Sequence, residues 1–550
     1  MNPVSNAEIA DRLSSLAQLL SAQKENPYKV KAYQRAAAKL RTFSESMDEL
    51  VRSDADLTQY AGIGEGIGSA IREIVRTGTL GKLEKLRSQA SPELASISQH
   101  PRLDPKRVLR IYKKLKISSV EELKENLESG VIEKTFGLRM AQHVRQGLTD
   151  VQAMLLYKAD DLRTAVESFL VDKCRVRRAE VAGDYRRRVE VIEELSFVVE
   201  TDDFPDLIAK LTRYGGRTEL LNSTDNTALF ALSSGILLRV HSASRGQWGL
   251  ALIEGTGSAA HLRKLAALGS AGSLPTETAV YRKLGLSFIE PELREGHDEV
   301  ERASQGTLPV LVSIKDIRGE LHAHSLSSDG AHSIEQMAAA AQAKGYEYLG
   351  ITDHSQSLKI ARGVSVEDLW KQIRFIDAIN GRTGIRILKS AEVDILADGS
   401  LDYPNDLLRE LDYTVCSIHS RFGLGKTEQT ERLLRAMDNR YFTILGHATG
   451  RLLLKRPGYE IDIDRVIAQA AKQGCFFEIN SSPDRLDLSA YNARLAAAAG
   501  VKIAISTDAH STREFGLIRC GIDQARRAGL EKSSVLNCLP WPKLRRLFKR

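Results

Sequence analysis

The chain has 550 residues, which is too long for one ordinary hydrophobic core and predicts two to four domains. It is 42% hydrophobic and 27% charged, as globular proteins are. No apolar run is long enough to span a membrane, so we expect a cytoplasmic protein without a membrane partner. A formal charge of +7 favours phosphate-rich partners, and five cysteines without a Cys-x-x-Cys pair argue against a cysteine zinc site or a disulfide framework.

The first 90 residues are predicted to be helical. An apolar stripe at helical spacing runs through Ile9, Leu13, Leu16, Leu19 and Leu20. A second helix is expected at 33–40, and the glycine-rich run 62–68 interrupts the helical pattern before it resumes at 70–75.

The rest of the chain falls into four further segments. Residues 91–150 are helical and rich in lysine, residues 151–300 mix strands with helices, and residues 301–315 are expected to be a connector. From 316 to 550, apolar strand-like runs alternate with helical ones, which predicts parallel β/α units. The strand-like runs lie at 195–199, 236–240, 348–352, 385–391, 413–418, 442–445, 475–479 and 501–506.

Seven of the twelve histidines lie after residue 320, mostly where short apolar runs end. His322 and His324 are two residues apart, so on a strand both point to one face and can share a cation. Asp508 and His510 have the same spacing, and Glu392 follows another strand-like run. Strand ends that converge on a site with several metals would produce this pattern. Mixed histidine and carboxylate ligands suit zinc, manganese or iron, with magnesium a further possibility.

These motifs resemble those of the PHP (polymerase and histidinol phosphatase) domain, a distorted β/α barrel that holds a trinuclear metal site. The resemblance implies one metal on His322, His324, Glu392 and Asp508, a second on Glu392, His419 and His447, and a third on Asp329, His354 and His510. It implies catalytic roles for His322, His324, Glu392, His419, Asp508 and His510. Arg362 either contacts a substrate phosphate or forms a structural ion pair, and His332 is either functional or caps a helix that begins near residue 333.

The first half resembles family X DNA polymerases. Residues 25–37 resemble the opening helices of that family, and the turn at 62–66 resembles a helix-hairpin-helix motif. In that motif, glycines allow a tight turn whose backbone N–H groups meet a DNA phosphate. The run 183–187 resembles the family's Gly-Ser-x-Arg-Arg segment. The resemblance therefore implies DNA contacts at Gly62, Gly64, Gly66, Arg186 and Arg187.

The polymerase site is predicted to be degenerate. The family uses three aspartates to hold two magnesium ions, and here their positions are occupied by Glu194, Ser196 and Leu237. One carboxylate cannot hold two metals against water, so we expect weak or absent nucleotide addition.

The fold expected is therefore a multidomain chain of α+β and α/β type. It comprises a helix-hairpin-helix region (1–90), a helical fingers-like region (91–150), a degenerate palm and thumb (151–300), a connector (301–315) and a PHP barrel (316–550). The favoured function is a monomeric, metal-dependent 3′-5′ exonuclease that acts on DNA primer ends, gaps or single strands. The alternatives are a family X polymerase with proofreading, a small-molecule phosphatase of the histidinol phosphate type, and a non-catalytic scaffold that binds DNA ends.

Overall fold

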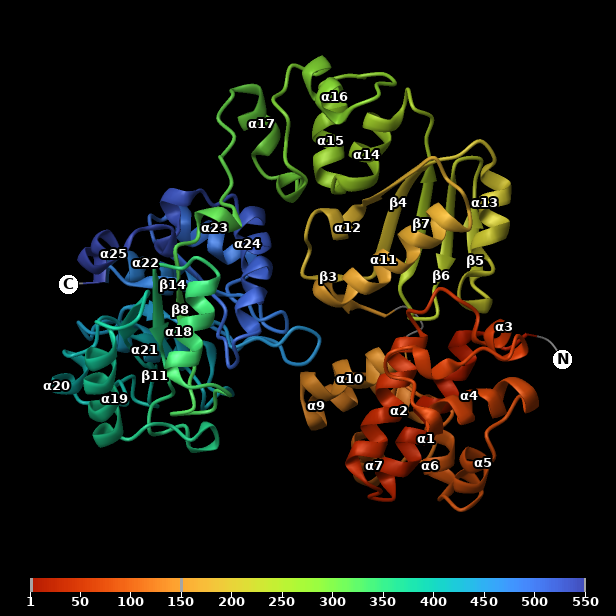
Figure 1. Cartoon of the computed structure of the whole chain (residues 1–550), viewed down its shortest axis with the longest axis horizontal. Helices are drawn as coiled ribbons and strands as arrows, with labels where there is room; N and C mark the ends of the chain where they lie inside the picture. The colour runs from red at the N-terminus through yellow and green to blue at the C-terminus, as the bar shows by residue number, and fades with distance from the viewer. Residues whose placement is uncertain (1–2, 149–151, 549–550) are drawn as a thin grey trace. The chain divides into compact units, whose positions relative to one another are not determined.

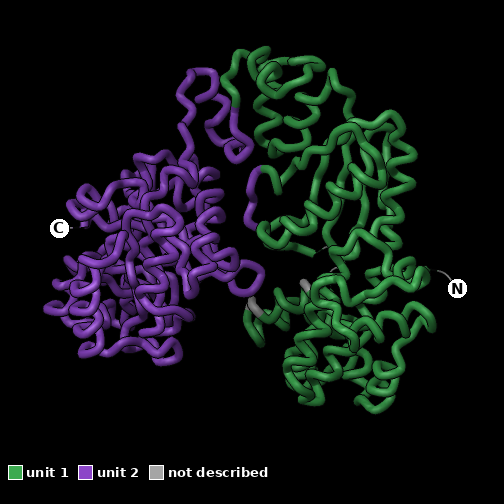
Figure 2. The backbone as a smooth tube through the Cα atoms, in the orientation of Figure 1, with its two compact units in different colours: residues 1–186, 191–288 green, residues 187–190, 289–550 purple. Residues whose placement is uncertain are grey.

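The computed structural model describes residues 3–148 and 152–548 and separates the chain into two compact units (Figures 1 and 2). Unit 1 comprises Met1–Arg186 and Val191–Phe288, and unit 2 comprises Arg187–Glu190 and Ile289–Arg550. Unit 2 thus begins before the connector expected at 301–315, and helix α17 (Glu299–Ser304) overlaps the start of that connector. The finer domain boundaries stay a prediction.

The N-terminal part of unit 1 is helical, as predicted. Helix α1 (Asn6–Ala22) begins at Ser5, which forms a capping box with Glu8, and the five apolar residues of its stripe are at most 1% exposed. Helix α2 (Pro27–Leu40) packs along it. The helices that follow are α3 (Met47–Arg52), α4 (Glu65–Thr77), α5 (Gly81–Ser88), α6 (Pro92–Ile97), α7 (Pro105–Leu115), α8 (Val120–Glu128), α9 (Val131–Phe136) and α10 (Leu138–Leu148).

The glycine-rich turn leads directly into α4. Gly62 has φ +91°, a backbone conformation that residues with a Cβ rarely adopt, and Gly64 is the residue before the helix. At Gly62, Gly64 and Gly66, no other atom lies within 4 Å of the position that a Cβ would take. The turn is therefore open, and the first N–H groups of α4 face no covering side chain there.

A mixed five-stranded sheet forms the second part of unit 1, in the order β2-β4-β7-β6-β5. Strands β4 and β7 are parallel, and the other neighbours are antiparallel. The bounds are β2 (Arg178–Ala182), β4 (Glu194–Glu200), β5 (Glu219–Ser223), β6 (Thr227–Ala231) and β7 (Leu237–Ser242). A small antiparallel pair joins β1 (Met154–Leu155) to β3 (Val191–Ile192). The helices are α11 (Leu156–Asp172), α12 (Gly183–Arg186), α13 (Phe204–Leu211), α14 (Trp248–Thr256), α15 (Ala259–Ala267) and α16 (Glu277–Lys283).

Unit 2 is a barrel of parallel strands. One sheet has the order β10-β9-β8 and the other has the order β11-β12-β13-β14-β15. A parallel bridge between Ala323 and Ala509 joins the ends of β8 and β15, and a second between His354 and Glu392 joins the segment after β9 to β11. The two sheets therefore close into one distorted barrel. Its strands are β8 (Gly319–Ala323), β9 (Tyr348–Ile351), β10 (Arg386–Lys389), β11 (Glu392–Asp394), β12 (Val415–Ser417), β13 (Ile444–Leu445), β14 (Phe476–Asn480) and β15 (Ile503–Ser506).

Helices alternate with these strands and cover the barrel (Figure 1). They are α18 (Ile334–Ala343), α19 (Val366–Ile379), α20 (Asn405–Leu408), α21 (Lys426–Met437), α22 (Ile463–Gln473), α23 (Ala490–Ala498), α24 (Ile518–Arg527) and α25 (Trp541–Phe548). Each strand-like run predicted from the sequence overlaps a strand, and the predicted fold class is confirmed. Within the described residues, no helix has the length and apolar character needed to cross a membrane.

Candidate metal centre

The nine predicted ligands lie near the carboxyl ends of the barrel strands. β8 carries His322 and leads directly to His324, and the segments after β9, β12, β13 and β15 carry the other histidines. Glu392 follows the end of β10 by three residues and is the first residue of β11. Because parallel strands end at the same edge of a barrel, side chains from seven separate sequence motifs meet there.

Glu392 lies at the centre of the cluster and is only 1% exposed. Its Oε1 is 2.9 Å from His447 Nε2 and 3.4 Å from His419 Nε2. Its Oε2 is 2.8 Å from His354 Nδ1 and 3.5 Å from His322 Nε2. Both carboxylate oxygens thus face imidazole nitrogens, which is the arrangement a bridging ligand needs.

Two aspartates complete the cluster. Asp508 Oδ1 is 2.9 Å from His324 Nε2. Asp329 Oδ2 is 3.4 Å from His510 Nε2 and 3.5 Å from His354 Nε2. Ligand atoms gather within 4.8 Å of one another in three overlapping groups: His324, Asp329, His354 and His510; His322, His324 and Asp508; and His354, Glu392 and His419. The structure brings together all nine residues, while their division among individual metals stays a prediction.

The donors fit divalent cations because several of them are buried without hydrogen bonds. Nε2 of His322 and Nδ1 of His324 have no hydrogen-bond partner among the described residues. The two histidines are fully buried. A buried polar atom left without a partner costs on the order of 1–3 kcal/mol. Cations bound between these atoms would remove that cost, and mixed nitrogen and oxygen donors suit zinc, manganese or iron.

A second set of carboxylates orients the histidines, and sequence reasoning missed it. Glu478 Oε1 lies 2.7 Å from His322 Nδ1, and Asp394 Oδ1 lies 2.5 Å from His419 Nδ1. Such pairs fix which ring nitrogen faces a metal. The available signals were a glutamate inside the apolar run 475–479 and the two-residue spacing between Glu392 and Asp394.

Asp508 has two further neighbours that the sequence did not single out. Asn480 Nδ2 donates to Asp508 Oδ2 at 3.1 Å, and Arg485 Nε lies 3.8 Å from the same oxygen. Arg485 therefore brings a positive charge to the edge of the cluster.

The carboxylates control the protonation of the histidines. Burial lowers the pKa of His354, but Glu392 and Asp329 outweigh burial and raise this pKa to about 10. In the same way, Glu392 and Asp394 raise the pKa of His419 to about 9. Burial also opposes charge on His510, yet Asp329 and Asp508 raise its pKa to about 9. The cluster thus has a strong electrostatic preference for positive charge.

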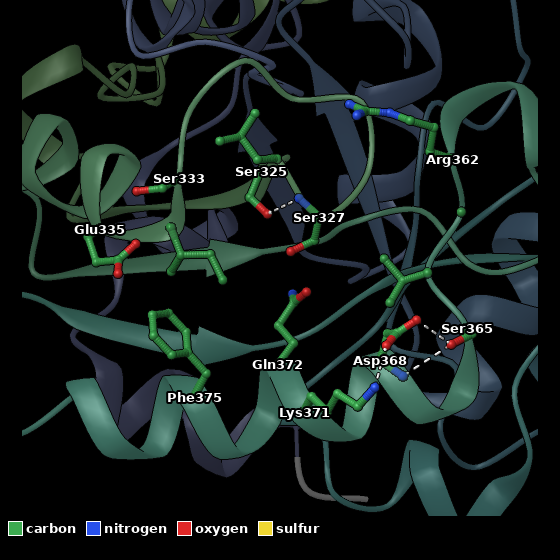
Figure 3. Close-up of a pocket in the computed structure, with 14 residues that line it drawn as sticks. Ser325, Ser327, Ser333, Glu335, Arg362, Ser365, Asp368, Lys371, Gln372 and Phe375 are labelled. Atoms are coloured by element: carbon green, nitrogen blue, oxygen red, sulfur yellow. Dashed lines mark hydrogen bonds and ion pairs between the residues drawn. The ribbon is translucent and has the colours of Figure 1, made fainter.

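Arg362 lies in the wall of a cavity (Figure 3). It follows a short 3-10 helix (Lys359–Ala361) and is exposed. Its guanidinium has no ion pair in the part of the chain that the structure describes, and its contact with a substrate phosphate stays a prediction. The helix cap near residue 333 is Ser333 itself, which accepts from Gln336 N. His332 joins none of the three ligand groups.

The predicted DNA contacts of the palm are engaged in ion pairs. Arg186 makes two hydrogen bonds to Glu277, at 2.8 and 2.7 Å. Arg187 Nε lies 3.2 Å from Glu295 Oε1. Their role in DNA binding stays a prediction, and these pairs do not favour it.

The degenerate polymerase positions lie together on β4 and β7. Glu194 pairs directly with Leu237 across the two parallel strands, and Ser196 pairs with Arg239. The Ser196 hydroxyl donates to Glu194 at 2.8 Å. Glu194 is the only carboxylate among the three positions, and it is already hydrogen-bonded.

Comparison with known proteins agrees with both halves of this description. The family model "Helix-hairpin-helix domain" matches residues 4–80, and "PHP domain" matches 320–482. "DNA polymerase/3'-5' exonuclease PolX" of Bacillus subtilis (strain 168) is 32% identical over 570 residues, which cover 99% of each chain. A "Probable phosphatase" of Acetivibrio thermocellus is 30% identical over 206 residues, 36% of this chain and 81% of that protein. A related "Probable phosphatase" of Thermoanaerobacter sp. (strain X514) is 31% identical over 229 residues, 40% of this chain and 89% of its own. The chain therefore belongs to the PolX family, the bacterial family X DNA polymerases that carry a C-terminal PHP domain.

Proposed function

We propose that the chain is a metal-dependent 3′-5′ exonuclease that hydrolyses phosphodiester bonds at DNA ends. The hydrolytic site is the cluster around Glu392, and unit 1 binds the DNA. The observation that carries this proposal is the gathering of nine ligand-type side chains at one barrel edge while the polymerase positions retain one carboxylate. The name of the B. subtilis relative, which includes a 3′-5′ exonuclease, agrees with it.

Three divalent ions, manganese or zinc with iron or magnesium as alternatives, would occupy the cluster. The sets are His322, His324, Glu392 and Asp508; Glu392, His419 and His447; and Asp329, His354 and His510. Ions bound there would polarise the phosphodiester and lower the pKa of water.

The chain's own residues orient the reaction. Asn480 holds one oxygen of Asp508, so that the other faces His324. Arg485 offers its charge to a phosphate oxygen as negative charge develops. His510 is 36% exposed and lies at the open edge of the cluster, where its Nε2 faces Asp329 and would help to hold a metal. Catalysis is thus assigned to His322, His324, Glu392, His419, Asp508 and His510.

Unit 1 would hold primer ends, gaps or single strands. The open turn at Gly62, Gly64 and Gly66 supports a phosphate contact at the start of α4.

A small-molecule phosphatase is the less favoured alternative, because the resemblance to the probable phosphatases covers about two fifths of the chain or less. The five cysteines are free and buried, which agrees with a reducing cytoplasm. We expect the protein to be a monomer.

Replacement of a central ligand tests this function. His324→Ala should abolish shortening of a 5′-labelled oligonucleotide in the presence of manganese, while its affinity for DNA, measured by fluorescence anisotropy, stays close to wild type. His332→Ala is the matched control, because this histidine is not among the nine predicted ligands. Unchanged cleavage by His324→Ala would show that the barrel is not the hydrolytic site.

A further inference from the structure

A cavity of about 570 Å³ lies in unit 2 (Figure 3). The loop 325–327, the start of α18, the segment 362–365 and α19 line it. Its volume falls within the ~300–1,000 Å³ that is typical of sites for small organic ligands. The cavity is therefore large enough for one nucleotide unit.

Two of its walls are attached to segments that carry predicted metal ligands. Ser325 directly follows His324, and its backbone N–H and hydroxyl donate to Asp353 at 2.8 and 2.6 Å. Asp353 in turn directly precedes His354. On the other side, Val364 N donates to His354 O at 2.8 Å. Two segments that line the cavity are thus joined directly to His324 and His354.

The cavity offers an aromatic ring and an unused hydrogen-bond acceptor. Phe375, from α19, is 39% exposed, and its ring faces the cavity (Figure 3). Gln372 lies one turn earlier and is 6% exposed, and its Nε2 donates to Asp353 Oδ2 at 3.1 Å. Because a carboxylate only accepts, this bond fixes the amide orientation. Gln372 Oε1 then has no hydrogen-bond partner among the described residues.

The cation at the rim completes the set. Arg362 extends along the upper wall in Figure 3. It belongs to the segment 362–365, in which Val364 N donates a hydrogen bond to His354 O. An apolar ring can stack on a base, a buried acceptor can bind an N–H group of that base, and a guanidinium can bind an anion. Together these features match the base and the phosphate of one nucleotide.

We propose that this cavity receives the 3′-terminal nucleotide of the DNA strand, with its base stacked on Phe375 and with Arg362 near its 5′ phosphate, the group that the cluster hydrolyses. The assignment rests on the proposed exonuclease function and adds the part of the substrate that the site recognises. A base in this cavity cannot remain paired with its complement. The enzyme would therefore act on single-stranded or frayed 3′ ends.

A change in the substrate combined with a change in the enzyme tests this proposal. Two 5′-labelled single strands are compared, one that ends in a normal nucleotide and one that ends in a tetrahydrofuran residue, which has no base. Wild type should remove the normal nucleotide faster, on the order of tenfold, as expected for stacking of one base on an aromatic side chain. In Phe375→Ala the ratio of the two rates should fall close to one, and in Phe375→Tyr it should be retained. Tyr491→Ala is the control, because Tyr491 is 61% exposed and does not line the cavity.

The outcomes separate the two proposals. Equal removal of both ends by wild type, or an unchanged ratio in Phe375→Ala, would overturn the cavity assignment and leave the exonuclease function standing. Removal of neither end by wild type would overturn both. Phe375 is 39% exposed. The ratio of the two removal rates in wild type is a test that does not depend on any variant.

Discussion

Arg239 and Glu194 form an ion pair with two hydrogen bonds, from Nε to Oε1 at 2.8 Å and from Nη2 to Oε2 at 2.7 Å. The arginine lies on β7, two residues after Leu237, and reaches across to the carboxylate on β4. The remaining acidic group of the polymerase positions is thus neutralised by a neighbour and faces a leucine instead of a second carboxylate. This arrangement cannot provide the oxygen ligands that a pair of magnesium ions requires.

We therefore expect no primer extension. A 5′-labelled primer–template with deoxynucleotides and either magnesium or manganese should give no product longer than the primer. The nuclease-deficient variant His324→Ala should be tested in parallel, so that shortening does not conceal extension. A longer product from either protein would show that the positions of Glu194, Ser196 and Leu237 support nucleotide addition.

Glu478→Gln should weaken metal binding without removing a predicted ligand. The carboxylate accepts from His322 Nδ1 at 2.7 Å, and so it directs Nε2 towards the cluster. Loss of such an orienting carboxylate typically lowers metal affinity about 10–100-fold. Competition with a chelator measures the affinity of each variant. Glu431→Gln is the matched control, because its carboxylate is 41% exposed on α21 and pairs with Arg465. Equal affinities in the two variants would mean that Glu478 does not position His322.

The fold was largely predictable because the barrel strands are short, continuous apolar runs separated by amphipathic helices. The run 385–391 shows where the pattern failed: it holds β10 and leads into a separate strand, β11, that begins at Glu392 and pairs with a different neighbour. Hydrophobic spacing alone cannot reveal such a change of partner, because both strands are buried in the same way. The ring closure at Ala323 and Ala509 is equally invisible, since it joins segments far apart in the sequence.

The predicted ligands could be found because histidine and carboxylate side chains are unusual at the ends of apolar runs. Arg485 and Asn480 could not, since neither residue type is rare in loops and strand ends. Their importance depends on contact with Asp508, which comes from another strand. The ion pair between Arg186 and Glu277 is a similar case, because it joins residues 91 positions apart.

Metal binding should release protons, and its affinity should rise with pH. In the metal-free site the pKa of His354 is raised to about 10, and those of His419 and His510 to about 9. These histidines are therefore protonated at pH 7.5, below their pKa values, whereas a metal binds only neutral imidazole. Affinity should increase by roughly tenfold per pH unit for each proton displaced, and it should level off above pH 9–10.

Titration calorimetry of the chelator-treated protein in buffers of different ionisation enthalpy measures this release. Asp394→Asn is an informative variant, because Asp394 helps to raise the pKa of His419. It should release fewer protons than wild type. Binding heats that do not depend on the buffer would contradict the prediction.

Gly350→Ala should destabilise the barrel, because strand β9 has no room for a side chain at this position. A Cβ at this position would lie 1.8 Å from the Tyr413 hydroxyl oxygen. Tyr413 cannot move away freely, since it is 2% exposed and its hydroxyl donates to Leu321 O at 2.6 Å. Overpacking of this kind costs about 1–3 kcal/mol. Gly381→Ala is the matched control, because no atom lies within 4 Å of its added Cβ. Urea denaturation followed by circular dichroism should show a lower midpoint for Gly350→Ala alone. Equal midpoints for the two variants would mean that the barrel accommodates the extra methyl group at this position.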